Sequence, residues 1–351
     1  MSTQLVFLLI YFHPFATYKS KSINAEYPVF LPVSMLIVAR NEASNLKELL
    51  PSLLTQDYPE FEIFILDDHS TDGTSQWLAE ISRQFPKIRY LRLTESSGKK
   101  SALDTAIRLL SYELVLLTDA DCRPASDQWI SLMVKHLETK TEVVLGYSPY
   151  FKQPGWINEL IGLETAFTAI LYFSFALRQH AYMGVGRNLL YRKQSLLRHF
   201  RPLDHPDLLS GDDDLTINSL SAGQKISIQY DPESWMYSIP KTSWKAWIDQ
   251  KKRHVGTARY YKTVDQVRLM LYYGSLVLSW ILAIVMGFIN PWVWVGWLVI
   301  KTSSFITVIR PCLNKLGAPL TFVKWLRAEG IYVIGLIHLF PFSTGKKWDK
   351  W

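Results

Sequence analysis

Cysteine is scarce in this sequence. Its 351 residues include 2 cysteines, Cys122 and Cys312, which lie far apart in unlike surroundings. Two such residues form neither a disulfide framework nor the spacing of a zinc site. Internal repeats and low-complexity tracts are also missing, and no basic region with a cleavage site marks a signal peptide. We therefore expect a non-repetitive chain whose soluble part stays in a reducing compartment.

Apolar and aromatic residues are abundant instead. Hydrophobic residues make up 48% of the chain, with 13 Trp and 18 Tyr, and the formal net charge is +7. Trp and Tyr are enriched where proteins meet the membrane surface. The basic residues cluster beside apolar segments, which favours an anionic membrane surface over nucleic acid as the partner. We therefore expect an integral membrane protein that does not bind nucleic acid.

The first apolar segment covers residues 5–18. As a helix it would span about 21 Å, less than the hydrocarbon core of about 30 Å. It is either a short anchor or the end of a longer one. Lys19 and Lys21 follow it, which predicts that the next stretch, and with it the soluble domain that follows, is cytoplasmic.

Three further apolar segments lie near the C-terminus. Residues 269–289 and 292–309 predict a helical hairpin of two spans, although Lys301 weakens the second. Residues 330–342 are too short for a clear span. If the basic tail GKKWDKW is cytoplasmic, this last segment is re-entrant or interfacial; if it crosses, the positive-inside rule is broken. The number of spans stays open.

Between these segments the pattern alternates strands and helices. We expect strands at 33–38, 61–66, 88–93 and 114–117 and helices at 45–54, 74–84 and 100–110. This alternation predicts an α/β domain with a mostly parallel sheet, helices on both faces, and ligands beyond the carboxyl ends of the strands. The expected domains are an anchor (1–26), a catalytic domain (27–240), an amphipathic interfacial region (241–268) and a membrane hairpin with a short third segment and a basic tail (269–351).

Polar residues follow the expected strands, at 39–42, 67–70, 98–100 and 118–121. A carboxylate at one strand end is ordinary, because Asp also caps helices and begins turns. Asp119 and Asp121, however, follow a wholly apolar strand, and residues two apart in extended backbone face the same side. Such a pair can hold Mg²⁺ or Mn²⁺ while leaving positions for phosphate oxygens and water. The turn from Gly98 to Lys100, which opens a helix, fits the same phosphate.

Two other clusters carry possible chemistry. In SGDDDL, the aspartates from Asp212 to Asp214 are either a solvated helix cap or the source of a general base for an acceptor hydroxyl. In WKAWIDQKKRH, Gln250, Arg253 and His254 share one helical face. This helix is either a basic interfacial helix or one that brings Arg253 to a diphosphate.

The ordered set of motifs resembles the membrane-bound family 2 glycosyltransferases, which have a GT-A fold. The motifs are VSMLIVARNEASNLKELLPSLLTQDYP, ILDDHSTDGT, SGKKSALDTA, LLTDADCRP, GVGRNLLYRK, SGDDDLT and QKKRH, spread over nearly the whole chain. The resemblance implies a nucleotide-sugar donor, with a UDP-sugar favoured, a divalent metal, and a lipid or glycolipid acceptor.

The resemblance also assigns roles residue by residue. The donor-binding positions would be Ala39, Asn41, Glu42, Asp67, Asp68, Lys99, Asp119, Gln250 and Arg253. The metal would be held by Asp119 and Asp121, and the acceptor-side loop would contain Gly184, Gly186 and Asn188. Three aspartates stand where the family has two acidic residues, so the base is Asp213 or Asp212. His254 replaces the tryptophan of the family's Q-x-x-R-W motif, which puts a stacking role there in doubt.

The expected reaction is therefore an inverting, metal-dependent sugar transfer to a lipid-linked or membrane-associated hydroxyl at the cytoplasmic face. Two alternatives stay open. One is a subunit that makes or exports a polysaccharide, and the other is a non-catalytic membrane scaffold that kept the fold.

Overall fold

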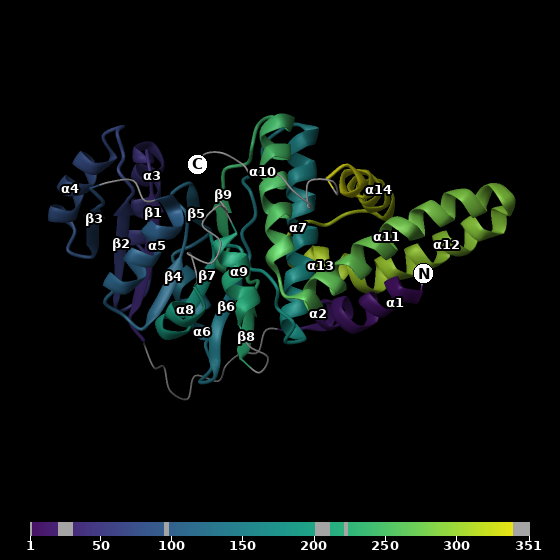
Figure 1. The fold of residues 1–351 in the computed structure, drawn as a ribbon, viewed down its shortest axis with the longest axis horizontal. Coiled ribbons are helices and arrows are strands. Elements are labelled where there is room, and N and C mark those ends of the chain that lie inside the picture. Colours follow the sequence, from purple (N-terminus) through teal and green to yellow (C-terminus); the bar gives the residue numbers. More distant parts are fainter. Residues whose placement is uncertain (1, 20–30, 95–97, 201–210, 221–223, 340–351) are drawn as a thin grey trace. The chain divides into compact units, whose positions relative to one another are not determined.

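The computed structural model describes residues 2–19, 31–94, 98–200, 211–220 and 224–339 (Figure 1). The chain divides into two compact units. The sheet unit contains residues 20–151 and 183–240, and the helical unit contains residues 1–19, 152–182 and 241–347. Each unit is described by itself.

The sheet unit is built on a seven-stranded sheet in the order β3-β2-β1-β4-β7-β6-β8. The strands are β1 (Val33–Ala39), β2 (Phe61–Asp67), β3 (Ile88–Arg92), β4 (Leu114–Leu117), β6 (Thr141–Gly146), β7 (Leu189–Arg192) and β8 (Lys225–Gln229). The first four are mutually parallel, whereas β7 runs antiparallel to both of its neighbours, β4 and β6. The expected mostly parallel α/β fold is confirmed.

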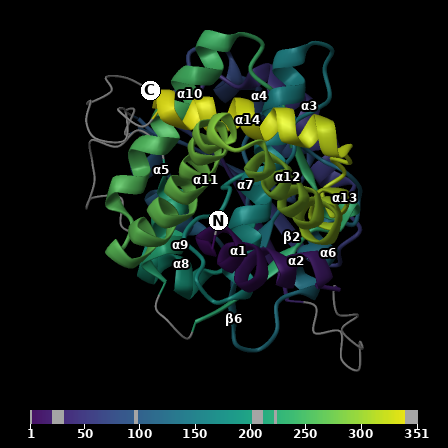
Figure 2. The same cartoon turned by 90° about the vertical axis from the view of Figure 1, so that its right-hand side faces the viewer.

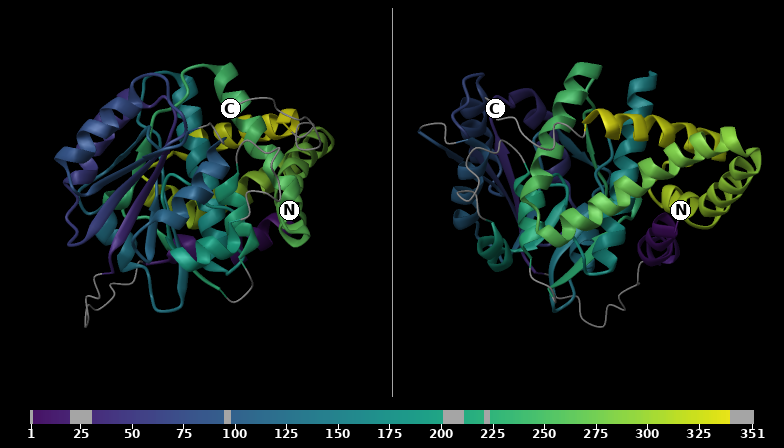
Figure 3. Two further views of the ribbon diagram at one scale, coloured as in Figure 1. Left: turned by 60° about the vertical axis from the view of Figure 1, so that its left-hand side comes forward. Right: turned by 45° about the vertical axis from the view of Figure 1, so that its right-hand side comes forward.

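The central strands of the sheet are buried on both faces, which explains why β4 is wholly apolar. All four residues of β4 and all seven of β2 are buried, because helices cover the sheet and leave no strand face for water. The helices of this unit are α3 (Ala43–Leu54), α4 (Thr74–Gln84), α5 (Gly98–Leu109), α6 (Trp129–Lys135), α8 (Lys193–His199) and α9 (Asp212–Ser219). Figure 3 shows the strands and helices of this unit from two further directions.

A small two-stranded sheet completes the unit. It pairs β5 (Cys122–Pro124), which begins one residue after Asp121, with β9 (Met236–Ser238) in antiparallel register. A short 3₁₀ turn, η3 (Pro232–Ser234), leads into β9. This pairing brings a segment from the end of the unit beside the Asp119–Asp121 turn.

The helical unit combines the N-terminal helices, an internal helix and the helices from α10 to α14. Its N-terminal part consists of α1 (Ser2–Phe7), the π-turn η1 (Leu8–Phe12) and α2 (His13–Thr17). The other helices are α7 (Trp156–Leu177), α10 (Trp244–Thr257), η4 (Ala258–Tyr260), α11 (Thr263–Ile289), α12 (Pro291–Ser304), η5 (Phe305–Ile309), α13 (Arg310–Lys315) and α14 (Phe322–Leu339). Figure 2 shows this unit from the side of α11 and α12.

Three described helices are long and apolar enough to cross a membrane: Trp156–Leu177, Thr263–Ile289 and Pro291–Lys315. In the first helix, 61% of the apolar 18-residue stretch is buried within the protein, compared with 22% and 28% in the other two helices. The hairpin expected from the sequence is present, and Asn290 caps its second helix by accepting a hydrogen bond from the Trp292 backbone N–H (3.0 Å). These helices indicate membrane association. Of the expected segment 330–342, residues 340–342 lie outside the described residues.

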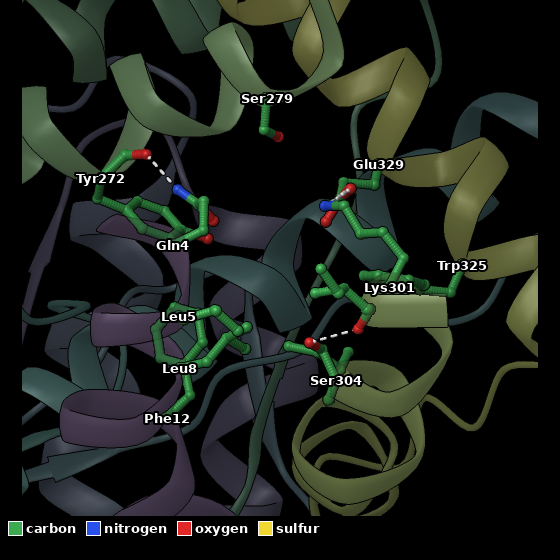
Figure 4. A pocket seen from close by; sticks show the side chains of 12 residues that line it. Gln4, Leu5, Leu8, Phe12, Tyr272, Ser279, Lys301, Ser304, Trp325 and Glu329 are labelled. Atoms are coloured by element: carbon green, nitrogen blue, oxygen red, sulfur yellow. Dashed lines mark hydrogen bonds and ion pairs between the residues drawn. The ribbon is translucent and has the colours of Figure 1, made fainter. Parts of the chain in front are cut away.

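Lys301, the charge inside the expected second span, is paired within the helical unit. Its ammonium group contacts the carboxylate of Glu329 on α14, and the Trp280 indole N–H donates to the same oxygen (2.9 Å). The pair lines a pocket with Gln4, Ser279 and Ser304, and Figure 4 shows these side chains around it. A buried charge among apolar helices is costly unless paired, so this contact explains how the span accommodates a lysine.

Candidate active site

The topology collects the polar strand ends at one edge of the sheet. Leu117 at the end of β4 pairs with Leu189 at the start of β7, and Leu189 also pairs with Leu145 near the end of β6. The carboxyl ends of β1, β2, β4, β6 and β8 therefore lie at the same edge as the loop before β7. This edge holds the sequence-predicted residues of the sheet unit.

The loops after β1 and β2 are locked to each other. Asn41 has a left-handed backbone (φ 57°), its N–H donates to Ser70 Oγ (2.8 Å), and its Oδ1 accepts from the Thr71 N–H (2.7 Å). Asp67 is fully buried and accepts from the Ser70 N–H (2.9 Å) and the Ser75 hydroxyl. Both side chains thus shape the loops, as expected for a preformed binding surface.

Two other residues predicted to bind the sugar donor are inaccessible to solvent. Ala39 and Asp68 are fully buried, and the Asp68 N–H donates to the Ala39 carbonyl (2.8 Å). The backbone of Lys99 belongs to the first turn of α5, but its side chain lies outside the described residues.

Glu42, which follows β1, is coupled electrostatically to the acidic residues that follow β4. Its carboxylate accepts a hydrogen bond from Asn45 Nδ2 (2.6 Å). Partial burial raises the pKa of Glu42, and the negative charges of Asp121, Asp119 and Asp72 raise it further, against the lowering by Asn45. The carboxylates of Glu42, Asp119 and Asp121 therefore share one electrostatic environment.

Asp119 and Asp121 both remain partly exposed after the buried strand β4. Asp121 accepts a hydrogen bond from the Ser238 hydroxyl of β9 (3.4 Å) and contacts the Cys122 thiol (3.5 Å). Among the described residues no group of three or more acidic, His or Cys side chains could enclose a metal ion. Two accessible carboxylates fit a Mg²⁺-type ion that takes its other ligands from substrate phosphates and water.

Arg187 is a component that the sequence analysis did not single out. Its guanidinium lies over the ring of Tyr150 (4.6 Å to the centroid) and donates to the Ser148 carbonyl (3.3 Å). Burial alone would lower the pKa of Arg187, but nearby Tyr150, Cys122, Asp119 and Asp121 raise it. The positive charge of Arg187 is therefore coupled electrostatically to the acidic pair. The only signal in the sequence was its place inside GVGRN.

The acidic cluster begins α9. Asp212 and Asp214 are buried, and Asp212 lies 3.4 Å from the ammonium group of Lys100, whereas Asp213 is partly exposed. The Gly186 N–H donates to Asp213 Oδ2 at 2.6 Å. All three aspartates occupy the first helical turn, where the helix dipole favours them. The cluster is therefore at a helix start, and it also joins the loop before β7.

The other two predicted residues of that loop, Gly184 and Asn188, are buried. Asn188 is fully buried; its Nδ2 donates to the carbonyls of Tyr147 and Ser234 (both 2.9 Å), and its Oδ1 accepts from the Trp129 indole (2.9 Å). A Cβ on Gly184 would come within 2.9 Å of the Leu189 side chain. Asn188 thus contacts the core and not the solvent, because its amide satisfies buried backbone carbonyls.

Gln250 and Arg253 lie on α10, in the helical unit. The helix begins at the Ser243 N-cap, whose hydroxyl accepts from the Ala246 N–H (3.3 Å). Lys251 on the same helix pairs with Glu164 of α7. Asp119, Asp121, Glu42 and the acidic cluster therefore all belong to the sheet unit, whereas the Q-x-x-R residues belong to the helical unit.

Part of the chain is similar in sequence to known proteins. Residues 34–200 match the model of glycosyl transferase family 2. A beta-monoglucosyldiacylglycerol synthase from Nostoc sp. is 34% identical over 29% of this chain and 22% of its own. A poly-beta-1,6-N-acetyl-D-glucosamine synthase from Staphylococcus epidermidis is 32% identical over 28% of this chain and 24% of its own. The chain thus spans under a quarter of the length of these two relatives.

A solved structure resembles the whole chain. The mannosyltransferase PcManGT from Pyrobaculum calidifontis, in complex with GDP-Man and Mn²⁺, superposes with a TM-score of 0.64 at 19% identity, over 100% of this chain and 96% of that one. The expected GT-A fold is confirmed. Residues 34–200, just under half of the chain, are similar to glycosyl transferase family 2.

Proposed function

We propose that this protein transfers a sugar from a nucleotide-sugar donor to a hydroxyl of a lipid-linked or membrane-associated acceptor, with inversion at the anomeric carbon. The observation that carries the proposal is the convergence of the Asp119–Asp121 pair, Glu42, and the Gly186–Asp213 contact at one sheet edge. The loops after β1 and β2 receive the nucleoside, through Ala39, Asn41, Asp67 and Asp68. Lys99 is predicted from the sequence motif to serve the phosphates.

Asp213 is the base in this proposal. It is the most exposed aspartate of the cluster, and the Gly186 N–H orients its carboxylate, while Asp212 is engaged by Lys100. Asp213 accepts the proton of the acceptor hydroxyl as that oxygen attacks the anomeric carbon. The bond between this carbon and the diphosphate oxygen breaks at the same time, and its electron pair leaves with the nucleoside diphosphate.

The charge of the departing diphosphate needs compensation. Asp119 and Asp121 are the residues that would hold Mg²⁺ or Mn²⁺, and such an ion, when bound, offsets that charge. The positive charge of Arg187 is coupled electrostatically to the same pair. The sequence motif also predicts Arg253 and Gln250 for the same diphosphate. A UDP-sugar is the donor that we favour.

Membrane attachment supports a lipid-borne acceptor. We propose that residues 1–26 and 269–351 contain the anchors, although 20–26 and 340–351 lie outside the described residues. Residues 241–268 form the proposed interfacial helix region, in which Trp244 is 46% exposed. We place the catalytic domain, residues 27–240, in the cytoplasm, because Lys19 and Lys21 follow the first apolar segment. The Nostoc relative is named for a glycolipid product, which agrees with this class of acceptor.

The test uses purified full-length protein in lipid with UDP-glucose, UDP-N-acetylglucosamine and GDP-mannose, each with Mn²⁺. Donor-dependent thermal stabilisation and donor hydrolysis separate an enzyme from a scaffold. Product masses separate single sugar transfer from polymer synthesis. A mass increase of one sugar on an extractable lipid supports our proposal. A series of products with many added sugars supports a polymer synthase, the activity for which the Staphylococcus relative is named. If none of the three donors is bound or hydrolysed, the proposal that this protein is an enzyme is contradicted.

A further inference from the structure

An aromatic cluster lies on one side of the candidate site. Phe151 and Tyr237 stack nearly parallel, with ring centroids 5.2 Å apart and 20° between the planes. Trp235 packs edge-on against Tyr237 at 6.2 Å, and Tyr147 packs edge-on against Trp235 at 5.2 Å. The proposed reaction assigns no role to these rings.

Backbone hydrogen bonds fix this cluster beside the acidic pair. The Phe151 N–H donates to the Ser238 carbonyl and the Ser238 N–H to the Pro149 carbonyl, both at 3.0 Å. Ser238 is opposite Cys122 in the β5–β9 ladder, and its hydroxyl donates to Asp121 (3.4 Å). The segment that carries Phe151 is therefore tied directly to the residue that bonds Asp121.

The exposure of the rings decreases inward. Phe151 is 37% exposed and Tyr237 is partly exposed, whereas Trp235 and Tyr147 keep 7% and 2%. The Trp235 indole N–H also donates to the Tyr230 carbonyl (3.0 Å), which fixes the supporting ring. The outer pair is thus accessible and rigidly backed, so a ligand that stacks there immobilises few additional side chains.

The order of strands indicates which substrate this cluster meets. The nucleoside loops follow β1 and β2, on one side of β4, whereas Tyr147 and Phe151 follow β6 and Tyr237 lies on β9, after β8. The loop of Gly186, which bonds Asp213, precedes β7 on this second side. The aromatic cluster is therefore on the side of the proposed base, where the acceptor hydroxyl must come.

We propose that the acceptor ends in a sugar ring, and that this ring packs on Phe151 and Tyr237 when its hydroxyl faces Asp213. A pyranose has apolar C–H faces that lose water on an aromatic surface. Arg187, held over Tyr150, supplies hydrogen-bond donors for the hydroxyl rim. The protein then extends a glycan already present on a lipid. This inference rests on the proposed function and narrows its acceptor class.

The test compares two acceptors on the same lipid, one bare and one carrying a terminal hexose, with one donor. Wild-type protein is expected to prefer the glycosylated lipid in kcat/KM. Phe151→Ala should reduce that preference by about 2- to 10-fold, the scale of one aromatic stacking contact, whereas Phe151→Trp should keep it. Because the readout is a ratio, a general loss of active protein cancels. Phe85→Ala is the matched control, since Phe85 is also an exposed phenylalanine (40%) of the sheet unit and lies at the end of α4.

Equal use of both lipids by wild-type protein, or an unchanged ratio in Phe151→Ala, would overturn the inference while leaving the transferase intact. Failure of the proposed function looks different, because no donor is then hydrolysed or transferred. In that event calorimetry with a free oligosaccharide decides: weaker binding to Phe151→Ala than to wild type supports the sugar site, and equal or undetectable binding to both refutes it.

Discussion

Gly186→Ala tests how the proposed base is positioned. The Gly186 backbone is not left-handed, so alanine introduces no backbone strain there. A Cβ at this position, however, would lie 2.5 Å from Asp213 Oδ2 and 2.6 Å from Asp213 Cγ. Contacts this short cannot persist, so the carboxylate has to move and its 2.6 Å hydrogen bond from the Gly186 N–H is lost or bent.

The expected magnitude follows from two effects. A hydrogen bond to a charged group contributes about 1.5–3 kcal/mol, and a displacement of about 1 Å at a reacting group can cost about 10²-fold in rate. We therefore expect kcat to fall about 10²-fold in Gly186→Ala, close to the fall expected for Asp213→Asn. Asp212→Asn should affect kcat less, because Asp212 is buried against Lys100.

The assay is single-turnover transfer with saturating donor, together with donor affinity by thermal shift. Donor affinity should hardly change in Gly186→Ala, since the nucleoside loops follow other strands. Gly162→Ala is the matched control, because a Cβ there meets nothing within 4 Å. A folded Gly186→Ala variant with wild-type kcat would refute the assignment of Asp213 as base, and so would a larger loss in Asp212→Asn than in Asp213→Asn.

Three further outcomes are expected. Asp121→Ala should abolish transfer and Mn²⁺-dependent donor binding with the melting temperature preserved, and full activity in EDTA would contradict the metal assignment. Buried Glu62 should add stability at neutral pH: burial raises its pKa, but hydrogen bonds from Ser34, Arg89 and Ser111 outweigh burial and lower the pKa below its ordinary value of 4.5. This stabilisation, about 1–3 kcal/mol, is present above the unfolded pKa of Glu62 and is lost as pH falls through its folded pKa. The melting temperatures of wild type and Glu62→Gln should therefore converge in acid. A difference between the two melting temperatures that stays constant with pH would disprove this pH dependence. Mass analysis should find one added sugar, or very few, per lipid, and polymer appearing across the bilayer would exclude single transfer.

Local features of this protein followed from the sequence alone. The apolar run 114–117 and the helix 74–84 have the expected bounds in β4 and α4, because a buried strand and an amphipathic helix are written in consecutive residues. The Asp119–Asp121 pair and the hairpin turn at Asn290 were visible for the same reason. The ordered motifs then indicated the family.

Contacts between distant residues needed the tertiary structure. No local pattern in the sequence predicts that β7 runs antiparallel between β4 and β6. This reversal brings the Gly186 loop to the sheet edge that carries Asp119 and Asp121, and to Asp213. Asn188 looks like a surface polar residue in the sequence and is fully buried, because its partners come from three other segments. Likewise Lys301 is tolerated in an apolar helix only because Glu329 meets it. Burial and charge pairing depend on what the fold places opposite each side chain, and that is decided by packing between elements far apart in the chain.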